Sequence, residues 1–135
     1  FRVVNLFVLN SQGQIWLPRR RPEKTHCPLH LDASMGGHVE SGETYEQALK
    51  RETLEELNLD VDQVDLKFLG HLTPQNDGIS AFMNVYETRM DEAPNYNRND
   101  FIEYLWLTPQ ELFARIAQGE KTKSALPKMI KIFYK

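Results

Sequence analysis

Residues Gly37 to Leu59 read GHVESGETYEQALKRETLEELNL, a glycine-rich loop followed by a helix-forming segment that ends in clustered charges. Positions i, i+3 and i+4 share one face of an α-helix, so Glu52, Glu55 and Glu56 fall within an arc of about 100°. The same arc holds apolar side chains: Tyr45, Ala48 and Leu49. An ordinary surface helix keeps its acids opposite its apolar stripe. These carboxylates are therefore predicted to point toward the interior of the protein.

Converging carboxylates repel one another unless a cation lies among them. Oxygen ligands at this density suit Mg²⁺ or Mn²⁺ and suit zinc poorly. Taken alone, the spacing E-x-x-E-E is also compatible with an acid-rich helix that faces solvent. The longer pattern around it favours the metal interpretation.

That longer pattern resembles the Nudix box, G-x5-E-x7-R-E-U-x-E-E-x-G-U, in which U is an aliphatic residue. The matching positions are Gly37, Glu43, Arg51, Glu52, Glu55 and Glu56. Thr53 replaces the first aliphatic residue, and its methyl group can still pack. Asn58 replaces the last glycine, which would adopt left-handed backbone after the helix, and Asn tolerates that conformation best among the other residues. Neither departure touches a metal ligand.

The resemblance implies an α/β fold, a Nudix-type α/β/α sandwich with a central mixed β-sheet, and a length of 135 residues fits one domain over 1–135. It also implies hydrolysis of a nucleoside diphosphate linked to another moiety. The implied metal ligands for Mg²⁺, or for Mn²⁺, are the Gly37 carbonyl, Glu52, Glu55 and Glu56. Arg51 would pair with a neighbouring carboxylate and orient it. Glu52 is the first candidate for the general base and Glu103 the second.

A basic run, Arg19-Arg20-Arg21 with Lys24 close behind, follows the first strands. Such a run is either a solvated edge or a clamp for phosphate oxygens, which Arg binds with two parallel hydrogen bonds. Within the family, Arg20, Lys24 and His38 look like the branch that includes isopentenyl diphosphate isomerase. There, a basic pair and a later lysine face the diphosphate, so Arg20 and Lys24 are candidate substrate-binding residues.

Two alternatives to a hydrolase are open. In the isomerase, a cysteine precedes the Gly-His pair and a further histidine binds metal, but this chain has Gly36 and Phe1 at those places. Without the thiol the same proton-transfer chemistry cannot run, so a hydrolase is favoured. The other alternative is a non-catalytic Nudix-like module that senses a nucleotide or binds a protein. Such modules commonly lose acids of the box, whereas this sequence keeps them.

Apolar alternation and turn residues predict the remaining elements. The predicted strands are 1–9 and 14–17 as a hairpin, 31–39 broken by Gly36 and Gly37, 66–72 and 79–88 as a second hairpin, and 101–107. The predicted helices begin near Glu43-Thr44, after Thr108 with a capping box, and at Ser124. Pro18 is expected to end pairing or to mark an edge, 74–78 to be a turn, and 90–100 to be a loop able to close over a site.

Composition narrows the partners. A net charge of −3 gives no basic face for long nucleic acids, and no apolar run approaches the roughly 20 residues of a membrane span, so a small diphosphate is the expected partner. A single cysteine, Cys27, excludes an internal disulfide and suits a reducing compartment such as the cytoplasm. Cys27 with His26 and His30 lacks the second thiolate of a typical zinc site, so the role of this loop stays open. A homodimer also stays open, and the start at Phe1 rather than Met leaves room for residues upstream.

Overall fold

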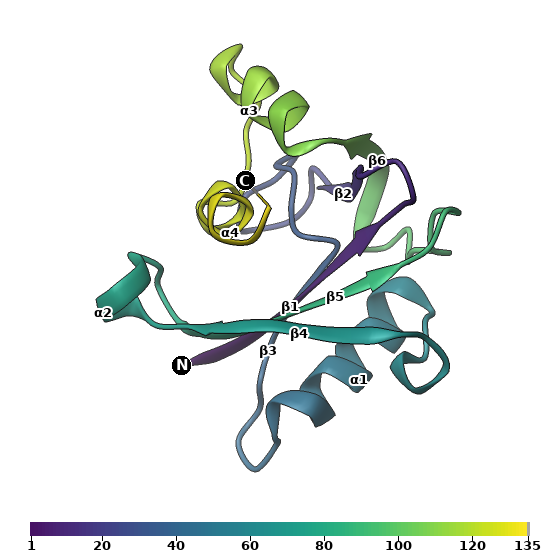
Figure 1. The fold of residues 1–135 in the computed structure, drawn as a ribbon, viewed down its shortest axis with the longest axis vertical. Coiled ribbons are helices and arrows are strands. Elements are labelled where there is room, and N and C mark those ends of the chain that lie inside the picture. The colour runs from purple at the N-terminus through teal and green to yellow at the C-terminus, as the bar shows by residue number, and fades with distance from the viewer. Residues whose placement is uncertain (135) are drawn as a thin grey trace.

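The computed structural model describes residues 1–134, and they form a central sheet with helices on both faces (Figure 1). The strands are β1 (Arg2–Leu9), β2 (Ile15–Arg20), β3 (Met35–His38), β4 (Leu66–Leu72), β5 (Phe82–Arg89) and β6 (Phe101–Leu107). The helices are α1 (Tyr45–Leu57), the 3₁₀ turn η1 (Val61–Gln63), α2 (Pro74–Asp77), α3 (Pro109–Ala117) and α4 (Ala125–Phe133).

The sheet runs in the order β4-β5-β1-β2-β6, and β3 pairs with β1 beside this path. β1 and β5 are parallel, whereas the other pairs are antiparallel, so the sheet is mixed. β1 and β2 share one register pair, Leu9 with Ile15, because β2 then turns away to pair with β6. β3 takes the edge of β1 that β2 leaves, from Val3 opposite His38 to Leu6 opposite Met35.

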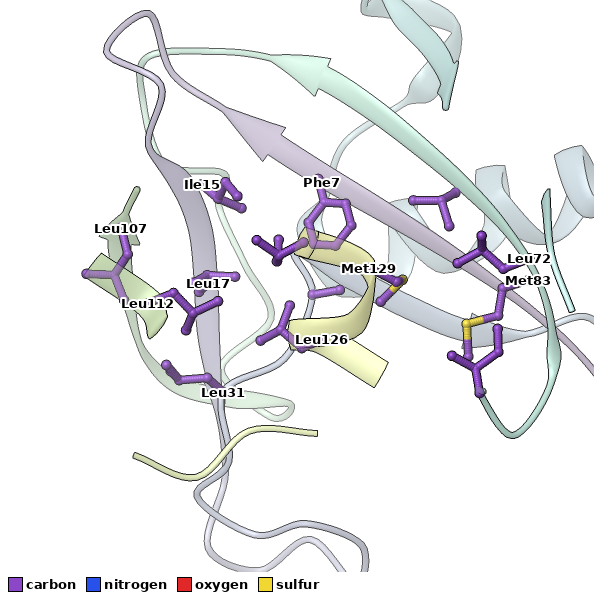
Figure 2. Packing of buried hydrophobic residues seen from close by; sticks show 14 of the residues in the cluster. Phe7, Ile15, Leu17, Leu31, Leu72, Met83, Leu107, Leu112, Leu126 and Met129 are labelled. Atoms are coloured by element: carbon purple, nitrogen blue, oxygen red, sulfur yellow. The ribbon is translucent and has the colours of Figure 1, made fainter. Parts of the chain in front are cut away.

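Two hydrophobic clusters pack on the two faces of the sheet because successive side chains of a strand point to opposite faces. Val4, Leu6 and Val8 of β1 pack on the side of α1. Phe7 and Leu9 pack on the other side, in the cluster that includes residues of α3 and α4. Figure 2 shows that second cluster, with the labelled side chains of α4, Leu126 and Met129, lying over the sheet. The predicted α/β/α sandwich with a mixed sheet is confirmed.

Several predicted elements are confirmed closely. β4 and β5 form the second hairpin and β6 spans the predicted residues. α3 begins at the predicted capping box of Thr108 and Glu111, and α4 begins at the predicted position. Asn58, at the C-terminus of α1, has φ 51° and ψ 37°, the left-handed conformation expected where the box has glycine.

Three predictions about irregular segments need correction. Gly36 and Gly37 do not break a strand, because β3 runs through both of them. β2 does not end at Pro18 but continues to Arg20. The Pro18 carbonyl points away from β6 and accepts a hydrogen bond from the Asp32 N–H at 3.0 Å. The N–H that proline lacks would lie on the same edge, so its absence does not interrupt the pairing with β6. The expected turn at 74–78 is the helix α2, capped by the Thr73 side chain with Pro74 in its first turn.

The 90–100 loop is fixed against the core and the end of α1. Tyr96 is 9% exposed and its ring lies 5.8 Å from that of Trp16. The Asn97 N–H donates to the Glu56 carbonyl at 2.7 Å, and the Asn58 side chain donates to the Asn95 carbonyl at 2.6 Å. The loop therefore acts as a support for the C-terminal turn of α1.

Candidate active site

Helix α1 is oriented by its caps and its buried stripe. The Thr44 hydroxyl accepts from the Gln47 N–H at 3.1 Å and the Gln47 side chain accepts from the Thr44 N–H at 2.9 Å, which closes a capping box. The side chains that pack into the core are Ala48, Leu49, Thr53 and Leu57. The Thr53 hydroxyl is buried without a hydrogen-bond partner among residues 1–134, which costs stability. Its methyl group occupies the position at which the Nudix box has an aliphatic residue.

The acidic end of α1 lies against the backbone of β3. A Cβ built on Gly37 would stand 2.4 Å from Glu52 Cγ and 2.5 Å from its carboxylate carbon. Only a glycine permits this approach, because real Cβ contacts do not occur below about 3 Å. β3 pairs with β1 beside the main path of the sheet, and the Glu52 side chain of α1 packs directly on its Gly37 backbone.

Arg51 fixes Glu52 from the other side. Its Nε and Nη2 donate to the two carboxylate oxygens of Glu43 at 2.8 and 2.9 Å, and its Nη1 donates to Glu52 Oε1 at 2.5 Å. Its Nη2 also donates to the His38 carbonyl at 3.1 Å, which ties α1 to the end of β3. The hydrogen bonds from Arg51 lower the pKa of Glu43 to about 2, so Glu43 stays ionised and holds the guanidinium in place.

Glu56 lies beside the carboxyl of Glu52 and close to further acids. Burial raises the pKa of Glu56 well above its ordinary value, and a hydrogen bond with the Glu52 carboxyl and the charges of Glu52, Asp32 and Asp100 raise it further. Two adjacent carboxyl groups beside the Gly37 backbone offer oxygen donors of the kind that a hard divalent cation prefers. Glu52, Glu56 and Gly37 therefore fit such an ion.

Glu55 departs from the predicted inward orientation. Its side chain is 61% exposed and its carboxylate lies 3.9 Å from Arg51 Nη1. Consistently, three or more His, Cys, Asp or Glu side chains are not gathered around one point anywhere within residues 1–134. Glu55 would join the pair only by turning its side chain inward, and its role as a ligand stays a prediction.

A cavity of about 740 Å³ opens beside the acid pair. Glu52, Glu56 and Gly37 line one part of it, together with Arg20. Its apolar lining comes from the sheet, from the residue before β5 and from α4: Val3, Met83, Ala81, Leu126 and Met129. One polar end and one apolar wall suit a ligand with a charged group joined to a less polar one.

The other predicted site residues lie outside this cavity. Lys24 Nζ forms an ion pair with Asp100 Oδ1 at 3.0 Å. Within residues 1–134, Lys24 is therefore connected to the Glu52–Glu56 pair only through Asp100. Glu103 is bound by Arg19, and its side chain is 51% exposed. Neither lines the cavity, so the structure brings Arg20, Gly37, Glu52 and Glu56 together and leaves Lys24 and Glu103 apart.

Three charged residues of the cavity were not predicted from the sequence: Asp32, Glu40 and Lys123. Asp32 is 7% exposed, and a lone acid within the apolar run from Leu31 to Met35 was the signal that could have found it. No sequence pattern pointed to Lys123, because its position at the cavity depends on the pairing of Leu31 with Thr122, which are distant in sequence. His26 and Cys27 also line the cavity, and Cys27 has φ 49°.

The chain is thus an α/β protein with a mixed sheet between helices and an Arg-oriented acid pair packed on a glycine backbone beside a cavity. The NUDIX domain model matches residues 1–129, and the chain therefore belongs to the Nudix family. The box predicted from sequence is thus confirmed, and the family membership supports a hydrolase.

Relatives extend over almost the whole chain. An uncharacterised Nudix hydrolase of Nostoc sp. is 58% identical over 99% of this chain and 79% of its own length. A crystal structure from Deinococcus radiodurans is 48% identical with a TM-score of 0.96, covering 99% of this chain and 83% of that one. An isopentenyl-diphosphate Delta-isomerase of Paenarthrobacter aurescens is 29% identical over 76% of this chain and 58% of its own length, which agrees with the resemblance to that branch.

Proposed function

We propose that this protein is a Mg²⁺-dependent hydrolase that cleaves the diphosphate linkage of a nucleoside diphosphate joined to another moiety, with Mn²⁺ as a substitute. The observation that supports it most is the Glu52–Glu56 pair, in which burial first, and then the hydrogen bond with Glu52 and the charge of Glu52, raise the pKa of Glu56. Gly37, Glu52 and Glu56 would hold the ion, with Glu55 as a further ligand. When bound, the ion would neutralise the diphosphate and lower the pKa of a bound water.

The roles of the side chains follow from their contacts. Glu52 is our candidate for the base that takes the proton of the attacking water, because it lines the cavity and Arg51 holds its carboxylate in place. Arg20 lines the cavity and suits the phosphate oxygens. Glu103 is the second candidate for the base and would first have to leave Arg19. Lys24 would act on the diphosphate after release from Asp100.

The substrate is a small molecule in this proposal. The cavity offers about 740 Å³, and its apolar wall suits the moiety attached to the diphosphate. A net charge of −3 disfavours long nucleic acids. Among residues 1–134 no helix has both the length and the apolar character needed to cross a bilayer. We place the protein in the cytoplasm as one domain, and a homodimer is compatible with the proposal.

A panel of nucleoside diphosphate derivatives, incubated with Mg²⁺ or Mn²⁺ and followed by product identification, tests this function. The expected result is metal-dependent release of a nucleoside monophosphate or of phosphate. Glu52→Gln and Glu56→Gln should each lower kcat by at least about 100-fold with an unchanged unfolding curve. Glu92→Gln, an exposed acid of the 90–100 loop, is the control and should keep full activity. Comparable turnover by both site variants would remove the mechanism.

The isomerase is a second candidate because of the 29% identical relative. The structure supplies an argument against it: a side chain at Gly36, where that enzyme has its cysteine, would stand 3.0 Å from Asn5 Oδ1. Cys27 lines the cavity and is the thiol that would have to substitute. Incubation with a prenyl diphosphate distinguishes the two, since an isomerase returns an intact diphosphate. A non-catalytic module would bind ligands from the same panel without turnover.

A further inference from the structure

The four cations of the basic run are not equally available to a ligand. Arg19 binds Glu103 and, at 2.8 Å, Glu120. Arg21 binds both oxygens of Glu23, and Lys24 binds Asp100. Arg20 is the member of the run that lines the cavity. Phosphate binding by the run would therefore rest first on Arg20.

Arg20 is anchored while part of its guanidinium remains open. Its Nε donates to the His26 carbonyl at 3.0 Å and its Nη1 to Asp32 Oδ2 at 3.3 Å. A guanidinium has five N–H donors, and within residues 1–134 its Nη2 makes no protein hydrogen bond. The side chain is thus oriented and still has donors for a planar or tetrahedral anion.

Lys123 reaches the same place from the far end of the chain. The Lys123 N–H donates to the Leu31 carbonyl at 3.0 Å and the Leu31 N–H donates to the Lys121 carbonyl at 2.9 Å, so this segment is fixed beside residue 31. Lys123 Nζ then lies 4.0 Å from Asp32 Oδ2, a loose contact, with its side chain 43% exposed and lining the cavity. The ammonium group can turn toward a ligand without breaking a close hydrogen bond.

Asp32 connects the two cations. Its side chain is 10% exposed, its Oδ1 accepts from the Ala33 N–H at 2.8 Å, and its Oδ2 faces Arg20 and Lys123. Two cations around one carboxylate leave a net positive charge. Asp32 is also close enough to Glu56 for its charge to raise the pKa of Glu56, so this positive group lies near the acid pair.

We infer that Arg20 and Lys123 form a phosphate-binding subsite, the cation pair, and that Asp32 is the positioning residue that holds them at the cavity wall. The inference rests on the proposed function, since it assigns the two phosphate groups of the same substrate to two different parts of the cavity. One phosphate group lies at the acid end with its metal, and the other lies against the cation pair. Lys123 thereby becomes a substrate-binding residue that the basic run did not include.

The test is binding of methylenediphosphonate, a diphosphate analogue without a hydrolysable linkage, measured by calorimetry in Mg²⁺. Lys123→Met should weaken binding by about tenfold, the loss expected for one charge-assisted contact, and Lys123→Arg should restore most of it. Lys121→Met is the matched control, because Lys121 is exposed in the same segment and does not line the cavity. It should bind the analogue like the wild type. Mn²⁺ affinity, followed by electron paramagnetic resonance, should be the same in all of them.

Asp32→Asn separates positioning from repulsion. If Asp32 positions the pair, the variant binds the analogue several-fold more weakly; if it only repels the anion, the variant binds more tightly, which would overturn the positioning role. Equal binding by Lys123→Met and the wild type, or no binding by the wild type, would overturn the cation pair. A wild type that binds the analogue through Lys123 yet turns over no compound would contradict the hydrolase and leave the cation pair standing.

Discussion

At the residue scale, the site depends on one missing side chain as much as on its acids. Gly37 has no Cβ, and Glu52 occupies the space that a Cβ would need. Arg51 prevents Glu52 from moving away, since it holds both Glu52 and Glu43. The glycine of the box is therefore a steric requirement of the acid that follows it on α1.

Gly37→Ala should lower turnover by about 100-fold, because the added methyl group pushes the Glu52 carboxylate out of register with the cavity. Enzyme assays together with Mn²⁺ titration would measure the loss, and both kcat and metal affinity should fall. Gly42→Ala is the control: Gly42 has φ 86° and no atom within 4 Å of its built Cβ, so this variant should lose about 1–2 kcal/mol of stability but keep its activity. Full activity of Gly37→Ala would show that Glu52 can move without cost.

At the element scale, α1 is held by its two ends. Asn58 closes the C-terminus in the left-handed conformation and its side chain donates to the Asn95 carbonyl at 2.6 Å. That hydrogen bond joins the acid-bearing turn of α1 to the 90–100 loop. The cap thus fixes both the helix end and the loop that supports Glu56.

Asn58→Ala should reduce the free energy of unfolding by about 2 kcal/mol, since it loses the hydrogen bond and places a Cβ at φ 51° without the local polar compensation of Asn. Asn58→Gly loses the same hydrogen bond but relieves the backbone, so it should be about 1 kcal/mol more stable than the alanine variant. Urea unfolding of the three proteins would measure both differences. The reverse order of the two variants would mean that the left-handed backbone carries no strain here.

Local chemistry explains which elements were predictable. The Thr108 capping box, the left-handed Asn58 and the spacing of the Nudix box are all set by residues a few positions apart, and each was found where expected. Helical spacing also indicated the acid face, but the buried stripe of α1 runs through Leu49, Thr53 and Leu57. Glu56 lies nearest to that stripe and Glu55 farthest from it, so the arc drawn from sequence was too wide by one residue.

Long-range contacts explain what was missed. Lys24 was expected at the substrate because it follows the arginines, but Asp100 from the far side of the chain binds it. Glu103 shares its strand pairing with Arg19, which removes it from the cavity. Asp32 and Lys123 meet only because Leu31 pairs with the segment before α4. None of these partners can be read from residues that are neighbours in sequence.

At the scale of the whole molecule, the acid pair couples stability to pH. The pKa of Glu56 is above its ordinary value of 4.5 in the folded protein, so the metal-free fold retains a proton that the unfolded chain has released. The free energy of unfolding therefore falls as the pH rises from about 4.5 toward the raised pKa. Glu43, with a pKa of about 2, acts in the opposite direction: its contribution is present above its ordinary value and is lost as the pH falls toward 2.

Glu56→Gln should be more stable than the wild type in a metal chelator at about pH 8, and the difference should shrink as the pH falls below 4.5, where the wild-type carboxyl is protonated in both states. Urea unfolding at several pH values would measure it. Saturating Mg²⁺ should reverse the order of the two proteins at about pH 8, because the ion stabilises only the fold that keeps the carboxylate. A constant difference across the pH range would contradict the assigned burial of Glu56.

The topology sets the order in which the polypeptide can mature during translation. β1 leaves the ribosome before the other strands of this sheet, yet Leu6 finds its parallel partner only at Tyr86, and Trp16 of β2 finds its partner at Trp106. Such distant pairings form slowly, over milliseconds to seconds, and until then the apolar strand is exposed to other chains. A nascent chain that stalls before β5 therefore has β2 and β3 beside β1 but leaves the other edge of β1 without its parallel partner, and it is at this stage that chaperones have the most to protect.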